Sequence, residues 1–371
     1  MTGFNGANGA NGANGANGAN GANGANGANG ANGANGANGA NGANGANGAN
    51  GANGANVAFP VVASQTAAFG IRHVAGNAPI QPGLVREDDR ANDAQMGLWS
   101  QQVREWLCIN EFLRNYSWQA EANEIRLRWS GKPMLTLLRP DANLLVGQLR
   151  FLTDYGDLRA ERGAEIIDQM GMLVDHYAHI LGITAARMPR LVELVNLTQA
   201  ICSHAVMTPK HCLAIRRPDQ LDARIMPMIP TPGHGSFPSG HATQAMAIAT
   251  ILAAIVNAKP DHYPDADARK ALLFKQAERI AANRTVAGVH YPIDSWAGAC
   301  LGREVARILV SMATAQRNKA AVHPAQLYKP EDRDYFVRDF QAHDHSYGTN
   351  YKVSFSGPIA WLWDKALDEL I

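Results

Sequence analysis

Two basic residues ahead of a proline, Lys210 and Arg217 before Pro218, form the first segment whose residue types suit a chemical task. The two cations are seven residues apart, so an α-helix would carry them on one face, two turns apart. A pair of cations on one face suits the oxygens of a bound oxyanion. A basic helix face exposed to solvent is the ordinary alternative, and this segment alone does not separate the two.

The second segment, Phe237-Pro238-Ser239-Gly240-His241, leads into an apolar stretch and predicts the N-terminus of a helix. The unpaired N–H groups and the dipole at such an end attract an anion. Ser239 could cap the helix or donate to a bound oxygen, and Gly240 would allow close approach of the backbone. His241 would then lie in the first turn, beside the anion. An ordinary helix cap with an unrelated histidine is the alternative.

The third segment runs from Asn283 to Asp294 and contains a third cation, Arg284, and a histidine, His290, four residues before Asp294. A carboxylate that accepts a hydrogen bond from one imidazole nitrogen fixes the tautomer and makes the other nitrogen a better nucleophile or ligand. His290 and Asp294 are candidates for such a pair. A purely structural histidine–aspartate pair is the alternative.

Taken together and in this order, the three segments closely resemble the signature of the superfamily that unites type 2 phosphatidic acid phosphatases, bacterial class A acid phosphatases and vanadium-dependent haloperoxidases. The matching residues are Lys210, Arg217, Pro218, Pro238, Ser239, Gly240, His241, Arg284, Gly288, His290 and Asp294. Asn283 departs from the pattern, because the family often has serine there. The resemblance implies a mostly α fold, a helical bundle of the phosphatidic acid phosphatase/haloperoxidase type.

The resemblance also implies how the site works. Family members hold a tetrahedral or trigonal-bipyramidal oxyanion, here vanadate, and phosphate competes for the same site. The groups that would bind its oxygens are the side chains of Lys210, Arg217, Arg284 and Ser239 and the N–H of Gly240. His290, oriented by Asp294, would be the axial ligand of vanadium or, toward a phosphate ester, the nucleophile that forms a phosphohistidine. His241 would transfer protons at the opposite apex, and Lys210 would polarise peroxide toward halide attack.

The surroundings of these residues favour a haloperoxidase that oxidises bromide or iodide rather than chloride with hydrogen peroxide. His234 lies seven residues before His241. The algal bromoperoxidases resemble this chain in having a second histidine at that offset, where the fungal chloroperoxidases and some bacterial iodoperoxidases have phenylalanine. A solvent-exposed loop histidine is the alternative interpretation of His234.

Two other functions remain open at this point. Met207 stands three residues before Lys210, where haloperoxidases usually carry tryptophan. This departure puts chlorination in doubt and keeps a soluble acid phosphatase acting on phosphate monoesters, with His241 as general acid, as the second hypothesis. A third is an anion-binding scaffold without turnover, which the intact pair of His241 and His290 disfavours.

Helical periodicity dominates the chain after residue 95, so the elements that position these segments are expected to be helices. We expect helices at residues 97–116, 142–155, 160–181, 189–207, 239–257, 266–282, 294–315 and 360–370. Strands at residues 125–129 and 135–138 are expected to form a hairpin. Residues 208–238 and 316–358 are expected to be long loops, and such loops usually carry function.

The N-terminal part of the chain differs in kind. Residues 5–55 repeat Asn-Gly-Ala, carry no charge and have no periodic apolar face, so a disordered arm is expected. A collagen-like strand is the alternative, but collagen stability depends on proline, which the repeat lacks. The sequence therefore predicts a low-complexity repeat arm at residues 1–56 and a catalytic domain at residues 57–371.

Charge and hydropathy exclude several classes of protein. The chain has 33 basic and 32 acidic residues, whereas a general nucleic-acid binder needs a strong basic excess. No apolar stretch is long enough to predict a membrane span, and no signal peptide is visible, so a cytoplasmic protein is expected, with non-classical export left open. The expected partners are hydrogen peroxide and halide, or a phosphate ester. Association into a homo-oligomer is also left open.

Overall fold

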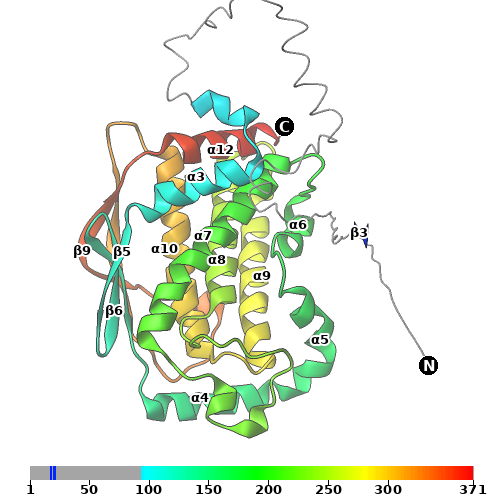
Figure 1. Ribbon diagram of the computed structural model, residues 1–371, viewed down its shortest axis with the longest axis vertical. Coiled ribbons are helices and arrows are strands. Elements are labelled where there is room, and N and C mark those ends of the chain that lie inside the picture. The colour runs from blue at the N-terminus through cyan, green and yellow to red at the C-terminus, as the bar shows by residue number, and fades with distance from the viewer. Residues whose placement is uncertain (1–16, 19, 22–92, 371) are drawn as a thin grey trace, which may run out of the picture. The chain divides into compact units, whose positions relative to one another are not determined.

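The computed structural model describes residues 17–18, 20–21 and 93–370 (Figure 1). The chain divides into two units, Met1–Leu107 and Cys108–Ile371. Most of the Asn-Gly-Ala repeat, expected to be a disordered arm, lies outside the described residues, as does the boundary expected after residue 56. That boundary therefore stays a prediction.

The described part of the first unit is small. Strands β2 (Asn17–Gly18) and β3 (Asn20–Gly21) pair in parallel. The 3-10 helix η2 (Asp93–Leu98) precedes α3 (Gln101–Leu113), which begins in this unit and ends in the second. The buried side chain of Arg104 donates from Nη1 to the carbonyl oxygen of Met96 at 3.0 Å, which ties η2 to the first turn of α3.

The second unit is a helical bundle around α8 (Gly240–Ala258), so the mostly α fold is confirmed. Helices α7 (Pro189–Leu213), α9 (Ala266–Val286) and α10 (Pro292–Thr314) pack against α8 (Figure 1). Most side chains of α8 are apolar and buried, which is typical of a helix at the centre of a bundle. Among the described residues, α8 is the one helix long and apolar enough to cross a membrane, and 67% of that stretch is buried inside the protein.

Shorter helices surround the bundle. They are α4 (Ala142–Asp154), α5 (Arg159–Asp168), α6 (Asp175–Leu181), α11 (Val337–Ala342) and α12 (Gly357–Asp368), with 3-10 turns η3 (Gly156–Leu158), η4 (Pro218–Gln220) and η5 (Ala223–Ile225). The single helix expected at residues 160–181 was wrong, because residues 169–174 form a turn that contains Gly171 between α5 and α6. The helix expected at 97–116 was too long, since a strand begins at Tyr116.

A five-stranded sheet lies beside the helices. Its strands are β5 (Tyr116–Glu121), β6 (Glu124–Trp129), β7 (Lys132–Leu138), β8 (Ala321–Tyr328) and β9 (Ser346–Val353), hydrogen-bonded in that order. The expected hairpin is confirmed as β6–β7, and its turn uses left-handed backbone at Ser130 and Gly131. The only parallel pair among the described strands of this sheet is β7 with β8, where Leu135 lies opposite Gln326.

The long loop expected at residues 316–358 was wrong. The segment contains β8, α11 and β9, and β9 completes the sheet by pairing antiparallel with β8. Six of the eight side chains of β9 are exposed, so the strand lacks the alternation of apolar and polar residues that would have predicted it.

Two glycines allow α10 to approach α8 closely. A Cβ added at Gly298 would lie 2.6 Å from the carbonyl oxygen of Ser239, and one added at Gly302 would lie 2.2 Å from that of Thr243. Both distances are too short for real atoms, so only glycine fits. Because α8 begins at Gly240, this contact fixes the position of its N-terminus relative to α10.

We expect Gly302→Ala to lower the free energy of unfolding by about 1–3 kcal/mol, because the added methyl group must push α8 and α10 apart. Gly147→Ala in α4 is a matched control, since its Cβ would meet no atom closer than 3.4 Å. Urea unfolding compares the two variants. A Gly302→Ala protein as stable as wild type would contradict the close approach.

Candidate active site

The three segments meet at one end of the bundle, where α7 and α9 end and α8 and α10 begin. The backbone N–H of Ser239 donates to the carbonyl oxygen of Asp294 at 2.9 Å, which joins the starts of α8 and α10. Lys210 donates from Nζ to the carbonyl oxygen of Ser236 at 2.9 Å, and Arg217 donates from Nη1 to that of Val289 at 2.8 Å. The structure thus brings together residues that are up to 84 positions apart in the sequence.

Lys210 and Arg217 reach the site in different ways. The shared helix face expected for them was wrong, because α7 ends at Leu213 and Ala214 adopts a left-handed φ of 47°. Arg217 lies in extended backbone, and its side chain is almost fully buried, as is that of Lys210. Helix α7 also runs past Pro209 and beyond the end expected at residue 207.

The loop before α8 lies directly on the end of α7. A Cβ at Gly235 would come within 2.6 Å of the carbonyl oxygen of Lys210, so glycine is needed for this approach. In return, the carbonyl oxygen of Gly235 accepts a hydrogen bond from Lys210 Nζ at 2.9 Å. The Lys210 ammonium group is thereby held by the carbonyl oxygens of Gly235 and Ser236.

The turn between α9 and α10 places Arg284 and His290. Gly288 has a left-handed φ of 80°, and a Cβ there would lie 2.9 Å from Nη2 of Arg159. Arg159 donates to three carbonyl groups, those of Val286 at 3.0 Å and of residues 225 and 226 at 2.9 Å each. This arginine, which no sequence motif indicated, ties the turn to the loop after Arg217.

His290 has its tautomer fixed from both sides. Its Nδ1 lies 2.8 Å from Oδ2 of Asp294, and its Nε2 lies 3.2 Å from Nη1 of Arg217. A guanidinium group can only donate, so Nε2 must be the acceptor and Nδ1 must carry the proton. Nε2 is therefore the nitrogen that carries the in-plane lone pair, which accepts from Arg217 here and could attack or ligate once that hydrogen bond is released.

Asp294 gathers three donors on one oxygen. Oδ2 accepts from His290 Nδ1, from the backbone N–H of Tyr291 at 3.1 Å and from the hydroxyl of Ser236 in a short hydrogen bond. Burial raises the pKa of Asp294, while the hydrogen bond from Ser236 and the charge of Lys210 act to lower it. Ser236 was not a sequence candidate, because a serine in a loop carries no signal of such a contact.

Gln169 connects Arg284 with His241. Its side-chain Oε1 accepts from Arg284 Nη2 at 2.8 Å, and its backbone carbonyl accepts from His241 Nε2 at 2.9 Å. Nε and Nη1 of Arg284 are buried and have no hydrogen-bond partner among the described residues. Gln169 lies in the turn after α5, where the sequence predicted continuous helix, so its role could not be anticipated.

The start of α8 offers backbone donors. Ser239 is the N-cap, and its hydroxyl accepts from the N–H of Ala242 at 3.3 Å, which leaves its own proton available. The N–H groups of Gly240 and His241 belong to the first turn, where a helix supplies no acceptor. These groups and the helix dipole can bind negative charge.

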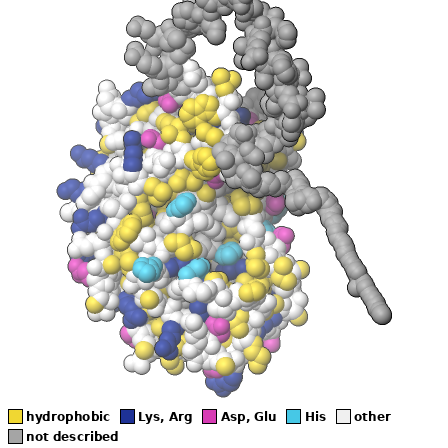
Figure 2. Space-filling view, viewed as in Figure 1, with side chains coloured by type: hydrophobic (Ala, Val, Ile, Leu, Met, Phe, Trp, Pro, Cys, Tyr) yellow, Lys and Arg dark blue, Asp and Glu magenta, His cyan; other side chains and the backbone are white. Residues whose placement is uncertain are grey.

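His234 lies at the edge of the site with an exposed ring. Its Nδ1 accepts from Arg217 Nη2 at 3.1 Å, and its carbonyl oxygen accepts from Arg217 Nε at 3.2 Å. Burial of part of the ring and the charge of Lys210 lower the pKa of His234. Figure 2 shows several histidine side chains gathered on one face of the molecule. Three histidines close to the motifs in sequence are exposed, namely His204, His211 and His234.

The site concentrates positive charge in a buried place. Burial, together with the charge of Arg217, lowers the pKa of Lys210 from 10.5 to about 7, and burial lowers that of Arg284 to about 10. Burial and the charge of Arg284 lower the pKa of His241 to about 3, and the pKa of His290 is also well below its usual value. Cations destabilised in this way favour a bound anion. Together with the unpartnered atoms of Arg284, they fit a tetrahedral oxyanion such as vanadate or phosphate.

Sulfate binding should therefore weaken as the pH rises through 7. Sulfate keeps its charge between pH 6 and 9, whereas Lys210, with a pKa of about 7, loses its proton in this range. We expect the affinity to fall about tenfold or more from pH 6 to pH 9, because only the charged lysine attracts the anion. Calorimetric titration measures the affinity, and Lys210→Arg, which stays charged, is the control. Equal pH dependence of the two proteins would rule out Lys210 as the titrating group.

Residues 191–318, which contain all of these candidate residues except Gln169 and Arg159, match the family model described as PAP2 superfamily. The chain carries a PAP2 superfamily domain. The PAP2 domain begins within α7 and extends past the end of α10, so it covers the four helices of the bundle. Residues 1–58 match a second model, the collagen triple helix repeat, consistent with glycine at every third position of the repeat.

One curated relative of this chain is a vanadium-dependent bromoperoxidase from Ascophyllum nodosum, 36% identical over 186 residues. The match covers 45% of this chain and 28% of the length of that protein. Among solved structures, a transmembrane PAP2 type phosphatidylglycerolphosphate phosphatase from Bacillus subtilis matches with a TM-score of 0.30 and 17% identity, over 47% of this chain and 98% of the other.

Proposed function

We propose that the chain is a vanadate-dependent haloperoxidase that uses hydrogen peroxide to oxidise bromide or iodide in preference to chloride. The observation that carries this proposal is the 36% identity with a vanadium-dependent bromoperoxidase. The groups that would hold the vanadate oxygens are the side chains of Lys210, Arg217, Arg284 and Ser239 and the N–H of Gly240. His290 would ligate vanadium through Nε2, the nitrogen that carries the lone pair.

Vanadate bound at this place would supply an electrophilic centre that activates hydrogen peroxide toward halide. The protein's own part is to hold charge and move protons. His241, with a pKa of about 3, is neutral at pH 7, and its Nε2–H donates to the carbonyl oxygen of Gln169. Its Nδ1 is therefore the atom that can accept a proton from hydrogen peroxide.

His234 is proposed to line the approach of the halide. We expect His234→Ala to raise the KM for bromide about tenfold, because Arg217 Nη2 loses the nearer of its two acceptors and keeps the carbonyl oxygen of Gly235 at 3.4 Å. His211→Ala is a matched control, since His211 is an exposed histidine on α7 next to Lys210. Steady-state kinetics with bromide and iodide test the variants. An unchanged bromide profile would make His234 an ordinary loop residue.

An acid phosphatase is the second candidate, and Met207 is the observation that favours it. This residue on α7 is 45% exposed, at the position where haloperoxidases usually carry tryptophan. In this case His290 Nε2 would attack phosphorus and break the ester bond, and His241 would have to protonate the leaving alkoxide. A pKa of about 3 for His241 places that activity at acid pH unless the bound ester raises the pKa.

A paired assay on one preparation of the full chain decides between the two. One half is loaded with orthovanadate and given peroxide with iodide, bromide or chloride, and the other half, kept free of vanadate, is given p-nitrophenyl phosphate. Vanadate-dependent halide oxidation that phosphate suppresses is the expected result. Ester hydrolysis inhibited by vanadate, without halide oxidation, would establish the phosphatase. Tight binding of both anions without any turnover would leave an anion-binding scaffold.

A further inference from the structure

A second cavity opens in the bundle, apart from the oxyanion site. It measures about 450 Å³ and lies between α8, α9 and α10, with β8 and α11 at its border. Apolar side chains form most of its wall, namely Met246, Ala254, Phe274, Val310 and Phe340. None of its lining residues belongs to the oxyanion site. Met246 is six residues beyond Gly240, which is about 9 Å along α8.

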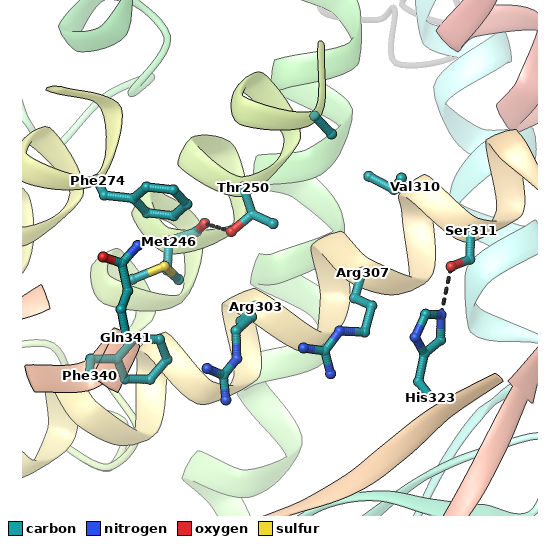
Figure 3. Close-up of a pocket in the computed structure, with 11 residues that line it drawn as sticks. Met246, Thr250, Phe274, Arg303, Arg307, Val310, Ser311, His323, Phe340 and Gln341 are labelled. Carbon is teal, nitrogen blue, oxygen red and sulfur yellow. Dashed lines mark hydrogen bonds between the residues drawn. The ribbon is translucent and has the colours of Figure 1, made fainter. Parts of the chain in front are cut away.

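The cavity has an apolar end and a basic end. Figure 3 shows Phe274, Met246 and Phe340 at one side of it and Arg307 at the other, with Arg303 between them. Arg303 and Arg307 are four residues apart on α10, so they lie on one face, one turn apart. No residue that lines the cavity in the described part of the chain is acidic.

One arginine charge at this place has no carboxylate partner. Arg307 donates from Nη1 to Glu304 Oε1 at 2.7 Å, and Tyr351 donates to the other oxygen of this buried carboxylate at 2.7 Å. Arg303 instead donates from Nη2 to the amide oxygen of Gln326 at 3.0 Å. Its Nε is buried without a hydrogen-bond partner, and its guanidinium carbon lies 4.6 Å from the ring centre of Phe340, again within the described residues.

A third polar pair lies at the basic end. The hydroxyl of Ser311 and Nε2 of His323 are 2.7 Å apart and both face the cavity (Figure 3). A ligand oxygen placed near Arg307 could bond to this pair as well. The lining therefore combines a wide apolar surface with a few polar groups at one end, as small-molecule sites do, and its volume falls in their range.

We propose that this cavity binds an organic monocarboxylate with an apolar body, the carboxylate between Arg303 and Arg307 and the body against Met246, Phe274 and Phe340. Charge complementarity selects an anion, because two arginines face the cavity and only one of them is neutralised. The apolar end selects a hydrocarbon chain or ring over a small inorganic anion. The site is independent of the proposed peroxidase or phosphatase activity.

Calorimetric titration of the full chain with octanoate tests the proposal, with octanamide as the neutral analogue. Octanoate is expected to bind saturably and octanamide about tenfold more weakly or worse, because only the anion forms charge-assisted hydrogen bonds. Arg303→Gln and Arg307→Gln should each weaken octanoate about tenfold and leave octanamide unchanged. Ala254→Trp, which fills the cavity, should abolish binding of both. Arg114→Gln removes an exposed arginine that does not line the cavity and should change nothing.

Two results would overturn the proposal. The first is equal affinity of the wild-type protein for octanoate and octanamide, which needs no variant and so does not depend on how the arginine replacements fold. The second is displacement of octanoate by saturating orthovanadate or phosphate, which would place the carboxylate in the oxyanion site. Retained octanoate binding by a chain without any turnover would support the cavity while contradicting the proposed function, so the two can fail separately.

Discussion

Replacing His290 with alanine is expected to lower kcat by about 10³-fold or more, in either of the two candidate reactions. The reason is that Nε2 of His290 carries the lone pair that could react, which accepts from Arg217, while Asp294 accepts from the other ring nitrogen. Alanine offers no atom that could ligate vanadium or attack phosphorus. Steady-state assays of the purified variant measure the loss.

The affinity for sulfate shows whether the loss of activity comes from the missing imidazole or from a folding defect. The three cations Lys210, Arg217 and Arg284 remain in the His290→Ala variant, so sulfate should still bind with an affinity within about tenfold of wild type. His211→Ala provides the matched control for removal of a histidine, because His211 is exposed and outside the site. If the His290→Ala enzyme kept more than a tenth of its turnover, the assignment of the site would have to be abandoned.

Asp294→Asn is expected to lower kcat by roughly 10³- to 10⁴-fold with little change in KM, as the equivalent change does in Ser-His-Asp triads. Asp294 accepts the Nδ1 proton of His290, and the loss of its charge removes the preference for that tautomer. If the proton moves to Nε2, the lone pair is lost, and Arg217 Nη1 faces another donor. The side chain keeps its size, so the fold should survive.

Nitrogen NMR of the His290 ring reports which nitrogen is protonated, alongside kcat and KM. Ser236→Ala is the graded comparison, since it removes one of three donors to the same oxygen and leaves the carboxylate charged. About a tenfold effect is expected from Ser236→Ala. A proton that stays on Nδ1 in Asp294→Asn, with turnover near that of Ser236→Ala, would show that Asp294 acts through packing alone.

The sequence predicted which residues the structure brings together, because these residues lie at helix ends, where local signals are strong. Pro189 and Pro292 occupy first-turn positions of α7 and α10, and Ser239 caps α8. These signals depend on a few neighbouring residues, so the starts of these helices could be placed within one or two positions. The residues next to them, which carry the family motifs, were placed at the same time.

Contacts that depend on the tertiary fold could not be predicted. Arg217 reaches the site because Ala214 adopts a left-handed backbone conformation that ends α7. Alanine rarely adopts this conformation, so the sequence does not predict it. Gln169 accepts hydrogen bonds from both Arg284 and His241. It lies in a turn for which the apolar pattern predicted a helix. Ser236 and Arg159 likewise gain their roles from segments distant in sequence.

The parallel pairing of β7 with β8 joins two strands that are synthesised far apart in time. The ribosome releases Lys132–Leu138 first and must then add α4 to α10 before Ala321–Tyr328 appears. At about 5–20 residues per second, the outer edge of β7 waits for roughly ten to forty seconds without its partner. An unpaired edge that carries Leu135 and Leu137 invites pairing with other nascent chains. The interval between the synthesis of the two strands is therefore a stage at which a chaperone that covers the edge of β7 would help this chain to fold.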